Sequence, residues 1–99
     1  MGWADRYIAE LKKGKTVEFR PTGRSMEPLV RSGQLVKVTP LTADTVLTMT
    51  ESIVLCEVKG KQYLHLVWGV DDGKYLIGNN KGYFNGWIHR SQIYGVRIP

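Results

Sequence analysis

One stretch of the sequence decides the predicted fold class: Ile53-Val54-Leu55-Cys56-Glu57-Val58-Lys59-Gly60-Lys61-Gln62-Tyr63-Leu64-His65-Leu66-Val67. Residues 52–58 form a largely apolar run of the kind found in buried strands. A Lys-Gly-Lys turn follows it and leads into a second, alternating run over 63–67. The stretch therefore predicts a β-hairpin.

Further strands are predicted on both sides of this hairpin. Apolar and polar residues alternate over 16–20 and 34–39, and a last strand is predicted over 92–98. A turn at 71–74 leads into a strand through Ile77, and residues 78–82 form a glycine- and asparagine-rich loop. The chain is thus predicted to be mainly β.

One short helix is predicted ahead of the strands. Trp3, Tyr7, Ile8 and Leu11 recur at the three- and four-residue spacing of an apolar helix face, and Gly14 follows as a stop signal. We expect a single domain over residues 1–99, with the helix in 1–14 and a β core in 16–98.

Composition excludes several classes of protein. No apolar run approaches the roughly 18 residues of a membrane-spanning helix, and the first residues lack a signal-peptide profile. Cys56 is the only cysteine, which excludes an internal disulfide and favours a reducing, cytoplasmic location. The histidines and the cysteine show no metal-ligand spacing, and no cofactor-binding motif is present, so neither a metal nor a cofactor is predicted.

The positive charge leaves one further class open. The net charge is +5, but the basic residues are dispersed, and Lys12, Lys13 and Lys15 form the one cluster. We interpret them as a solvated surface. Nucleic-acid binding, which would weaken steeply with salt, stays an alternative without a recognised groove-reading motif to support it.

A serine and a histidine form a candidate catalytic pair. Ser25 lies in a predicted turn, in the stretch Gly23-Arg24-Ser25-Met26-Glu27-Pro28, and His65 lies on the return strand of the hairpin. A hydroxyl nucleophile needs a base to take its proton, and a histidine that titrates near neutrality is a suitable one. Backbone N–H groups of Arg24 and Ser25 would stabilise an oxyanion, and Gly23 suits a sharp turn.

These residues resemble the superfamily of LexA-type self-cleaving repressors and type I signal peptidases. The first motif, Gly-x-Ser-Met with a following Pro, is matched by residues 23–28, and the hairpin with the base on its return strand is matched by 53–67. His65 takes the place of the family's usual lysine, as in signal peptidases of the endoplasmic reticulum and archaea. The resemblance extends over about residues 16–98 and implies a coiled β-sheet fold.

Some positions depart from the family pattern. Family acidic positions are occupied by Gln34, Ser52 and Asn79. Asn79, in a stretch similar to the Gly-Asp-Asn box, has the place of the residue that would orient a catalytic histidine; Asp71 or Asp72 is an alternative from the neighbouring turn.

The resemblance implies a serine peptidase with a Ser25–His65 dyad that cleaves a protein or peptide in trans, of a type expected in bacteria or phages. Self-cleavage is not expected, because 24 residues precede Ser25 and no Ala-Gly or Cys-Gly dipeptide occurs. The alternative is a catalytically inactive version of the same fold that serves as a protein-binding module.

Overall fold

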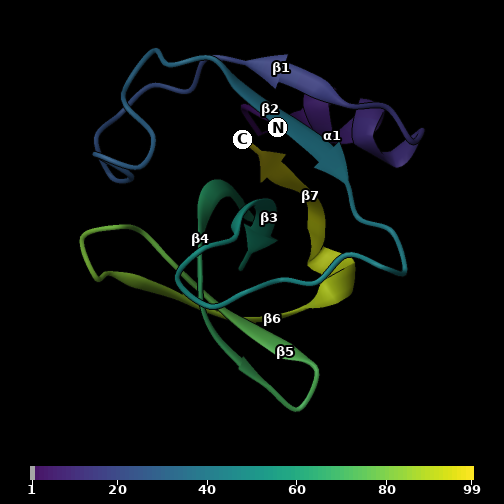
Figure 1. The fold of residues 1–99 in the computed structure, drawn as a ribbon, viewed down its shortest axis with the longest axis vertical. Helices are drawn as coiled ribbons and strands as arrows, with labels where there is room; N and C mark the ends of the chain where they lie inside the picture. The colour runs from purple at the N-terminus through teal and green to yellow at the C-terminus, as the bar shows by residue number, and fades with distance from the viewer. Residues whose placement is uncertain (1) are drawn as a thin grey trace.

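The computed structural model describes residues 2–99, and its main feature is one antiparallel sheet of seven strands (Figure 1). The strands are β1 (Val17–Phe19), β2 (Val36–Pro40), β3 (Ile53–Val58), β4 (Lys61–Asp71), β5 (Lys74–Gly78), β6 (Phe84–His89) and β7 (Ile93–Ile98). They lie side by side in the order β1-β2-β7-β3-β4-β5-β6. The helical elements are α1 (Asp5–Lys12) and a short 3-10 turn, η1 (Arg90–Gln92). The prediction of a mainly β chain with one short N-terminal helix is confirmed.

Strand β3 lies between two hydrophobic cores, which explains its uninterrupted apolar sequence. Ile53 and Leu55 belong to a core shared with α1, β1 and β2. Val54, Cys56 and Val58 point the other way, into a core shared with β5, β6 and β7. Because successive side chains of a strand alternate between its faces, a strand covered on both sides needs apolar residues at nearly every position.

The predicted turn of the β3–β4 hairpin is confirmed as a tight connection. Val58 pairs with Lys61, and the two residues between them, Lys59 and Gly60, have φ of 51° and 81°. Positive φ at both central residues gives a turn whose twist matches that of the paired strands. Strand β4 then continues to Asp71, four residues beyond the predicted end at 67, and its pairing with β5 shifts between Val67 and Gly69.

Strand β6 was not predicted from the sequence. In its pairing with β5, Phe84 lies opposite Gly78 and Gly86 lies opposite Ile77. Asn85 between them has no partner residue on β5 and is an extra residue in the ladder. Such a bulge redirects side chains at the edge of a sheet. Gly86 has φ of 144°, a backbone conformation that residues other than glycine rarely adopt.

Helix α1 lies against the sheet through one apolar face. Ile8 and Leu11 are buried in the core with β1 and β2, and Gly14, with φ of 84°, follows the helix end. The part of the chain that the structure describes has no helix of the length and apolarity that crossing a membrane requires.

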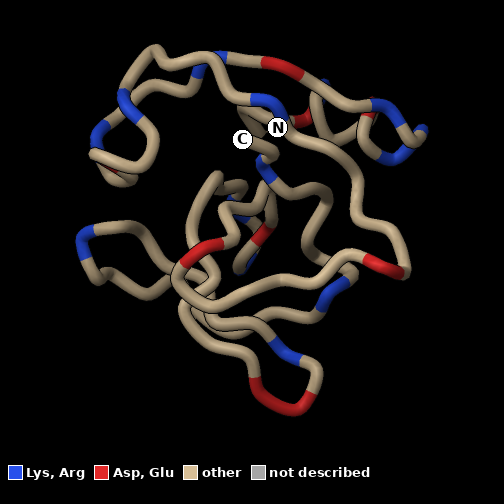
Figure 2. The backbone as a smooth tube through the Cα atoms, in the orientation of Figure 1, with Lys and Arg blue, Asp and Glu red and all other residues tan. Residues whose placement is uncertain are grey.

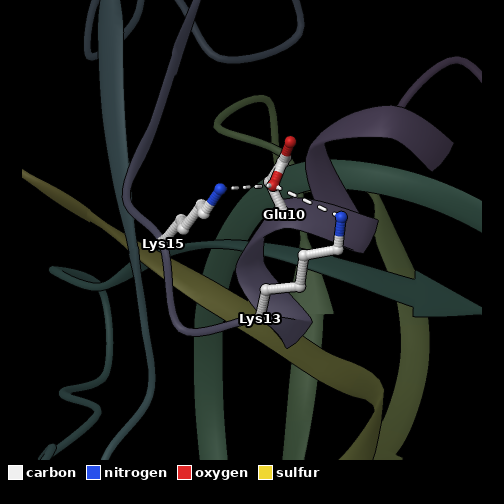
Figure 3. A network of polar contacts seen from close by, with 3 residues as sticks. All are labelled: Glu10, Lys13 and Lys15. Atoms are coloured by element: carbon white, nitrogen blue, oxygen red, sulfur yellow. Dashed lines mark ion pairs between the residues drawn. The ribbon is translucent and has the colours of Figure 1, made fainter.

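The lysine cluster at the end of α1, which consists of Lys12, Lys13 and Lys15, is partly neutralised by contacts within the chain. Glu10 lies 4.0 Å from Lys13 Nζ and 3.8 Å from Lys15 Nζ (Figure 3). Lys12 lies over the ring of Tyr94 instead. These pairs are consistent with a solvated surface, and Figure 2 shows the other basic residues spread over the fold rather than gathered on one face.

Candidate functional site

Ser25 lies in the long loop between β1 and β2, in a turn anchored by buried side chains. The Glu27 N–H donates to the Arg24 carbonyl at 3.2 Å, and the Val30 N–H donates to the Met26 carbonyl at 3.0 Å. The side chains of Met26 and Val30 are 5% and 3% exposed. The turn is thus attached to the core by the residue that directly follows Ser25, while Ser25 itself stays half-buried.

A second loop holds the Ser25 turn from the other side. Asn80, between β5 and β6, donates its backbone N–H to the Ser25 carbonyl at 2.8 Å and its side-chain amide to the Glu27 carbonyl at 2.9 Å. The two loops lie on the same side of the molecule (Figure 1). Two bonds from one residue to either side of the turn restrict its rotation, which makes Asn80 a positioning residue for Ser25.

The fold brings Ser25 and His65 together although 40 residues separate them. Ser25 Oγ lies 3.4 Å from His65 Nε2. His65 is on β4, opposite Val54 of β3, and is 8% exposed. The distance is at the long end for a hydrogen bond.

Asn85 contacts the other nitrogen of the His65 ring. Its Oδ1 lies 2.7 Å from His65 Nδ1. Because an amide oxygen can only accept a hydrogen bond, Nδ1 carries a proton and donates a hydrogen bond to this oxygen. In the neutral ring, Nε2 then has the free electron pair and accepts the hydrogen bond from the Ser25 hydroxyl. Ser25, His65 and Asn85 therefore form a chain of two contacts, one at each ring nitrogen, with the imidazole in the form that a general base requires.

The residue suggested by the sequence for orienting His65 has a different place. Asn79 Oδ1 accepts hydrogen bonds from the backbone N–H groups of Lys81 and Tyr83, so Asn79 shapes the β5–β6 loop. Asp71 and Asp72 are exposed at the β4–β5 turn. The orienting contact is made by Asn85, because the bulge in β6 turns this side chain toward β4.

Burial lowers the pKa of His65 from its ordinary value of 6.5, and the hydrogen bond to Asn85 opposes this effect in part. The imidazole is consequently neutral at pH 7. A neutral ring is the state that can accept a proton from Ser25.

The lowered pKa of His65 predicts a stability that depends on pH. Below pH 6.5 the unfolded chain takes up a proton that the folded protein binds less readily, so stability should fall as the pH decreases from about 6.5 toward the folded-state pKa. The contribution of one proton cannot exceed about 1.4 kcal/mol per pH unit. Urea unfolding between pH 5 and 8, bracketing a histidine pKa, should show a smaller slope in His65→Gln than in the wild type. Equal slopes in the wild type and in His65→Gln would contradict the assignment.

A pocket with a volume of about 150 Å³ lies next to the pair and includes Ser25, His65 and Gly23 in its wall. The Gly23 N–H is bonded to Ser32 Oγ at 3.1 Å. The N–H groups of Arg24 and Ser25 donate no hydrogen bond to any group within residues 2–99. Of these two residues with unbonded N–H groups, Ser25 lines the pocket and Arg24 directly precedes it in the turn.

Replacing Asn85 should change the titration of His65 in opposite directions for two variants. Asn85→Asp places a carboxylate at Nδ1 and should raise the pKa of His65, because the anion stabilises the imidazolium. Asn85→Leu removes the bond that raises the pKa and should lower it further. The His65 ring signals in an NMR titration of the wild type and the two variants measure both shifts without a substrate. A His65 pKa that is the same in all three proteins would exclude Asn85 as its orienting partner.

Sequence reasoning missed Asn85, Asn80 and Trp3 as parts of this region. Asn85 stands in an Asn-Gly dipeptide, which ordinarily signals a turn rather than a strand. Asn80 directly follows the candidate orienter Asn79 in the same loop, and Trp3 matches the apolar stripe of the helix. Each of them makes a hydrogen bond to a residue that is distant in the sequence. Local sequence patterns carry no information on such contacts.

Two other titratable side chains lie outside this site. Cys56 is fully buried, and burial raises the pKa of its thiol to about 12, so it is an unreactive core residue. His89 is exposed. Among residues 2–99, no three His, Cys, Asp or Glu side chains gather in an arrangement that could hold a metal ion.

Fold and site together define a mainly β protein in which a serine hydroxyl and an amide contact the two nitrogens of a neutral imidazole, next to a small pocket lined by the serine and the histidine. Such an arrangement can transfer a proton from the hydroxyl to the ring, which is the first requirement of a serine nucleophile. No family model matches this sequence, and no curated protein matches it.

Proposed function

We propose that this protein is a serine peptidase-like hydrolase that cleaves a polypeptide in trans, and that it is related to the LexA and type I signal peptidase superfamily. The observation that carries the proposal is the Ser25–His65–Asn85 arrangement, with 3.4 Å between Ser25 Oγ and His65 Nε2 and 2.7 Å between His65 Nδ1 and Asn85 Oδ1. The sequence motif around Ser25 and the position of His65 on the hairpin's return strand add to this support.

The proposed reaction begins with proton transfer. His65 Nε2 takes the proton of the Ser25 hydroxyl while Oγ attacks the carbonyl carbon of the scissile peptide. The negative charge that develops on the carbonyl oxygen is stabilised by the free N–H groups of Arg24 and Ser25. His65 then returns the proton to the leaving amine, and an acyl ester remains on Ser25.

Water then hydrolyses the acyl ester, and His65 again acts first as a base and then as an acid. His65 takes a proton from the water molecule as it attacks the ester, and the proton passes to Ser25 Oγ as the acyl group leaves. Asn85 keeps Nδ1 protonated throughout, so Nε2 always faces Ser25. An amide can orient the ring but offers no negative charge to the imidazolium, so a slower reaction is expected than with a carboxylate in this place.

We also propose a cytoplasmic location. The support is chemical: the single cysteine is buried, and its thiol has no second cysteine with which to form an internal disulfide.

Two features favour the second candidate function, an inactive fold that binds a peptide. The orienting residue is the uncharged Asn85, and the Ser25–His65 distance is longer than in a well-formed pair. The two functions differ in one outcome, because a binding module retains peptides without cutting them.

The test is a cleavage assay on a mixed peptide library, read by mass spectrometry, between pH 6 and 9 to bracket a histidine base. Wild-type protein should cut peptides at recurring positions, and Ser25→Ala should leave the same library intact while remaining folded by circular dichroism. Contamination by a foreign peptidase is excluded when the cuts disappear in Ser25→Ala purified in the same way. No cutting by the wild type at any of these pH values would reject the peptidase and leave the binding module.

A further inference from the structure

The helix side of the Ser25 pocket carries a second, larger pocket. It has a volume of about 280 Å³ and is lined by Trp3, Tyr7, Phe19, Arg20, Pro21 and Thr22. Trp3, Pro21 and Thr22 also line the 150 Å³ pocket at Ser25. The two pockets are therefore neighbours, and Trp3 belongs to the lining of both.

The larger pocket has an aromatic wall. Tyr7 and Phe19 stack with their ring centroids 4.5 Å apart, and the Trp3 ring meets Phe19 edge-on at 5.7 Å. Arg20 lines the same pocket, and its guanidinium is held in place by a bond from Nη1 to the Gly33 carbonyl at 3.0 Å. Aromatic rings attract other aromatic rings edge-on or offset, and a fixed guanidinium attracts the face of a ring.

Trp3 is held in position yet left open to solvent. Its indole N–H donates to the Gln62 carbonyl on β4 at 3.0 Å, and the Gln62 side chain accepts from the Ala4 N–H at 2.8 Å. The residue is nevertheless 52% exposed, whereas Phe19 beneath it is 6% exposed. A tryptophan that only attached the helix to the sheet would bury its ring; a fixed and exposed ring is suited to contact a bound molecule.

We propose that the pocket of Trp3, Tyr7, Phe19 and Arg20 is a substrate subsite for an aromatic side chain that lies within a few residues of the scissile bond. The inference deepens the proposed function and rests on it, since the occupant is the polypeptide cleaved at Ser25. The pocket of about 280 Å³ is larger than the pocket of about 150 Å³ at Ser25, so the aromatic side chain fits the former. An extended peptide advances about 3.3–3.6 Å per residue, which lets one chain reach both pockets.

The test has a cleavage arm and a binding arm on the same synthetic peptide library. In the cleavage arm, peptides cut by the wild type should be enriched in Phe, Tyr or Trp at one fixed distance from the cut. Trp3→Ala should abolish this enrichment and lower kcat/KM for aromatic peptides about 3- to 10-fold, mainly through KM, because one aromatic contact is lost. Peptides with alanine at that position should lose less in kcat/KM than aromatic peptides do, and this difference, not an unchanged rate, is the readout, because Trp3 also lines the pocket at Ser25.

Two further variants separate a subsite from a general effect. Trp3→Phe keeps a ring against Phe19 and should lose selectivity in the same direction by a smaller factor, which covers the case that Trp3→Ala does not fold. Trp87→Ala is the matched control, because Trp87 is similarly exposed, at 49%, and lines neither pocket. It should keep the wild-type preference.

The binding arm separates failure of the subsite from failure of the peptidase. Ser25→Ala protein is used to capture peptides from the library, alone and combined with Trp3→Ala. Capture of aromatic peptides that depends on Trp3, with no cleavage by the wild type, supports the subsite and rejects the peptidase. Cleavage without an aromatic preference, unchanged in Trp3→Ala, overturns the subsite and leaves the peptidase. If neither capture nor cleavage is observed, both the subsite and the peptidase are rejected.

Discussion

Ser25→Ala should reduce kcat/KM for a cleaved peptide by about 10⁴-fold, and adding His65→Ala should lower it little further. The two side chains act as a unit, since the hydroxyl is a weak nucleophile without a base and the imidazole has no proton to accept without the hydroxyl. Their contact of 3.4 Å between Oγ and Nε2 is the structural reason for this expectation. Single-turnover and steady-state cleavage of one peptide by the wild type, the two single variants and the double variant measure it.

Matched controls for this series are present elsewhere in the chain. Ser91→Ala and His89→Ala replace exposed residues of the same types and should keep wild-type rates. If the losses caused by Ser25→Ala and His65→Ala multiplied in the double variant, the two residues would act independently, and a dyad would be excluded.

Gly78→Ala should destabilise the folded protein by about 1–3 kcal/mol, the usual cost of an added methyl group in a packed site. A Cβ at Gly78 would lie 2.7 Å from the Tyr83 carbonyl oxygen, 2.7 Å from the Phe84 ring and 2.8 Å from the Trp68 ring. The carbonyl belongs to the backbone and cannot turn aside as a side chain can. Relief of this contact requires that the start of β6 move away from β5, and urea unfolding at pH 7 measures the resulting loss.

A second glycine on the same sheet serves as the control. At Gly69 a Cβ would meet mainly the Trp87 ring, at 3.2 Å, and that side chain is exposed and can move. Gly69→Ala should therefore cost less than Gly78→Ala. Because Asn85 directly follows Phe84, Gly78→Ala should also loosen the contact between Asn85 and His65 and shift the His65 titration toward that of Asn85→Leu. Equal stability losses at the two glycines would show that backbone contact at Gly78 is not the cause.

Local patterns in the sequence were sufficient for most of the secondary structure. The apolar run of β3 and the Lys59-Gly60 turn specify their hairpin through side-chain burial and positive φ, both of which depend on adjacent residues. The end of β4 was placed too early, at Val67, because Gly69 weakens a strand pattern, and there the pairing with β5 in fact shifts its register. Strand β6 was missed for a similar reason, since Asn85-Gly86 reads as a turn and forms a strand only by pairing with β5.

The sequence by itself determined that this protein is mainly β with one N-terminal helix, and it indicated Ser25 and His65 as a candidate catalytic pair. Only the tertiary structure decided that Asn85 rather than Asn79 faces His65, that Asn80 holds the Ser25 turn, and that Trp3 borders the pocket. The physical reason is the range of the interactions. Periodicity and turn preferences act between neighbours in the chain, whereas the bulge that redirects Asn85 and the bonds that join the two loops exist only after distant strands have paired.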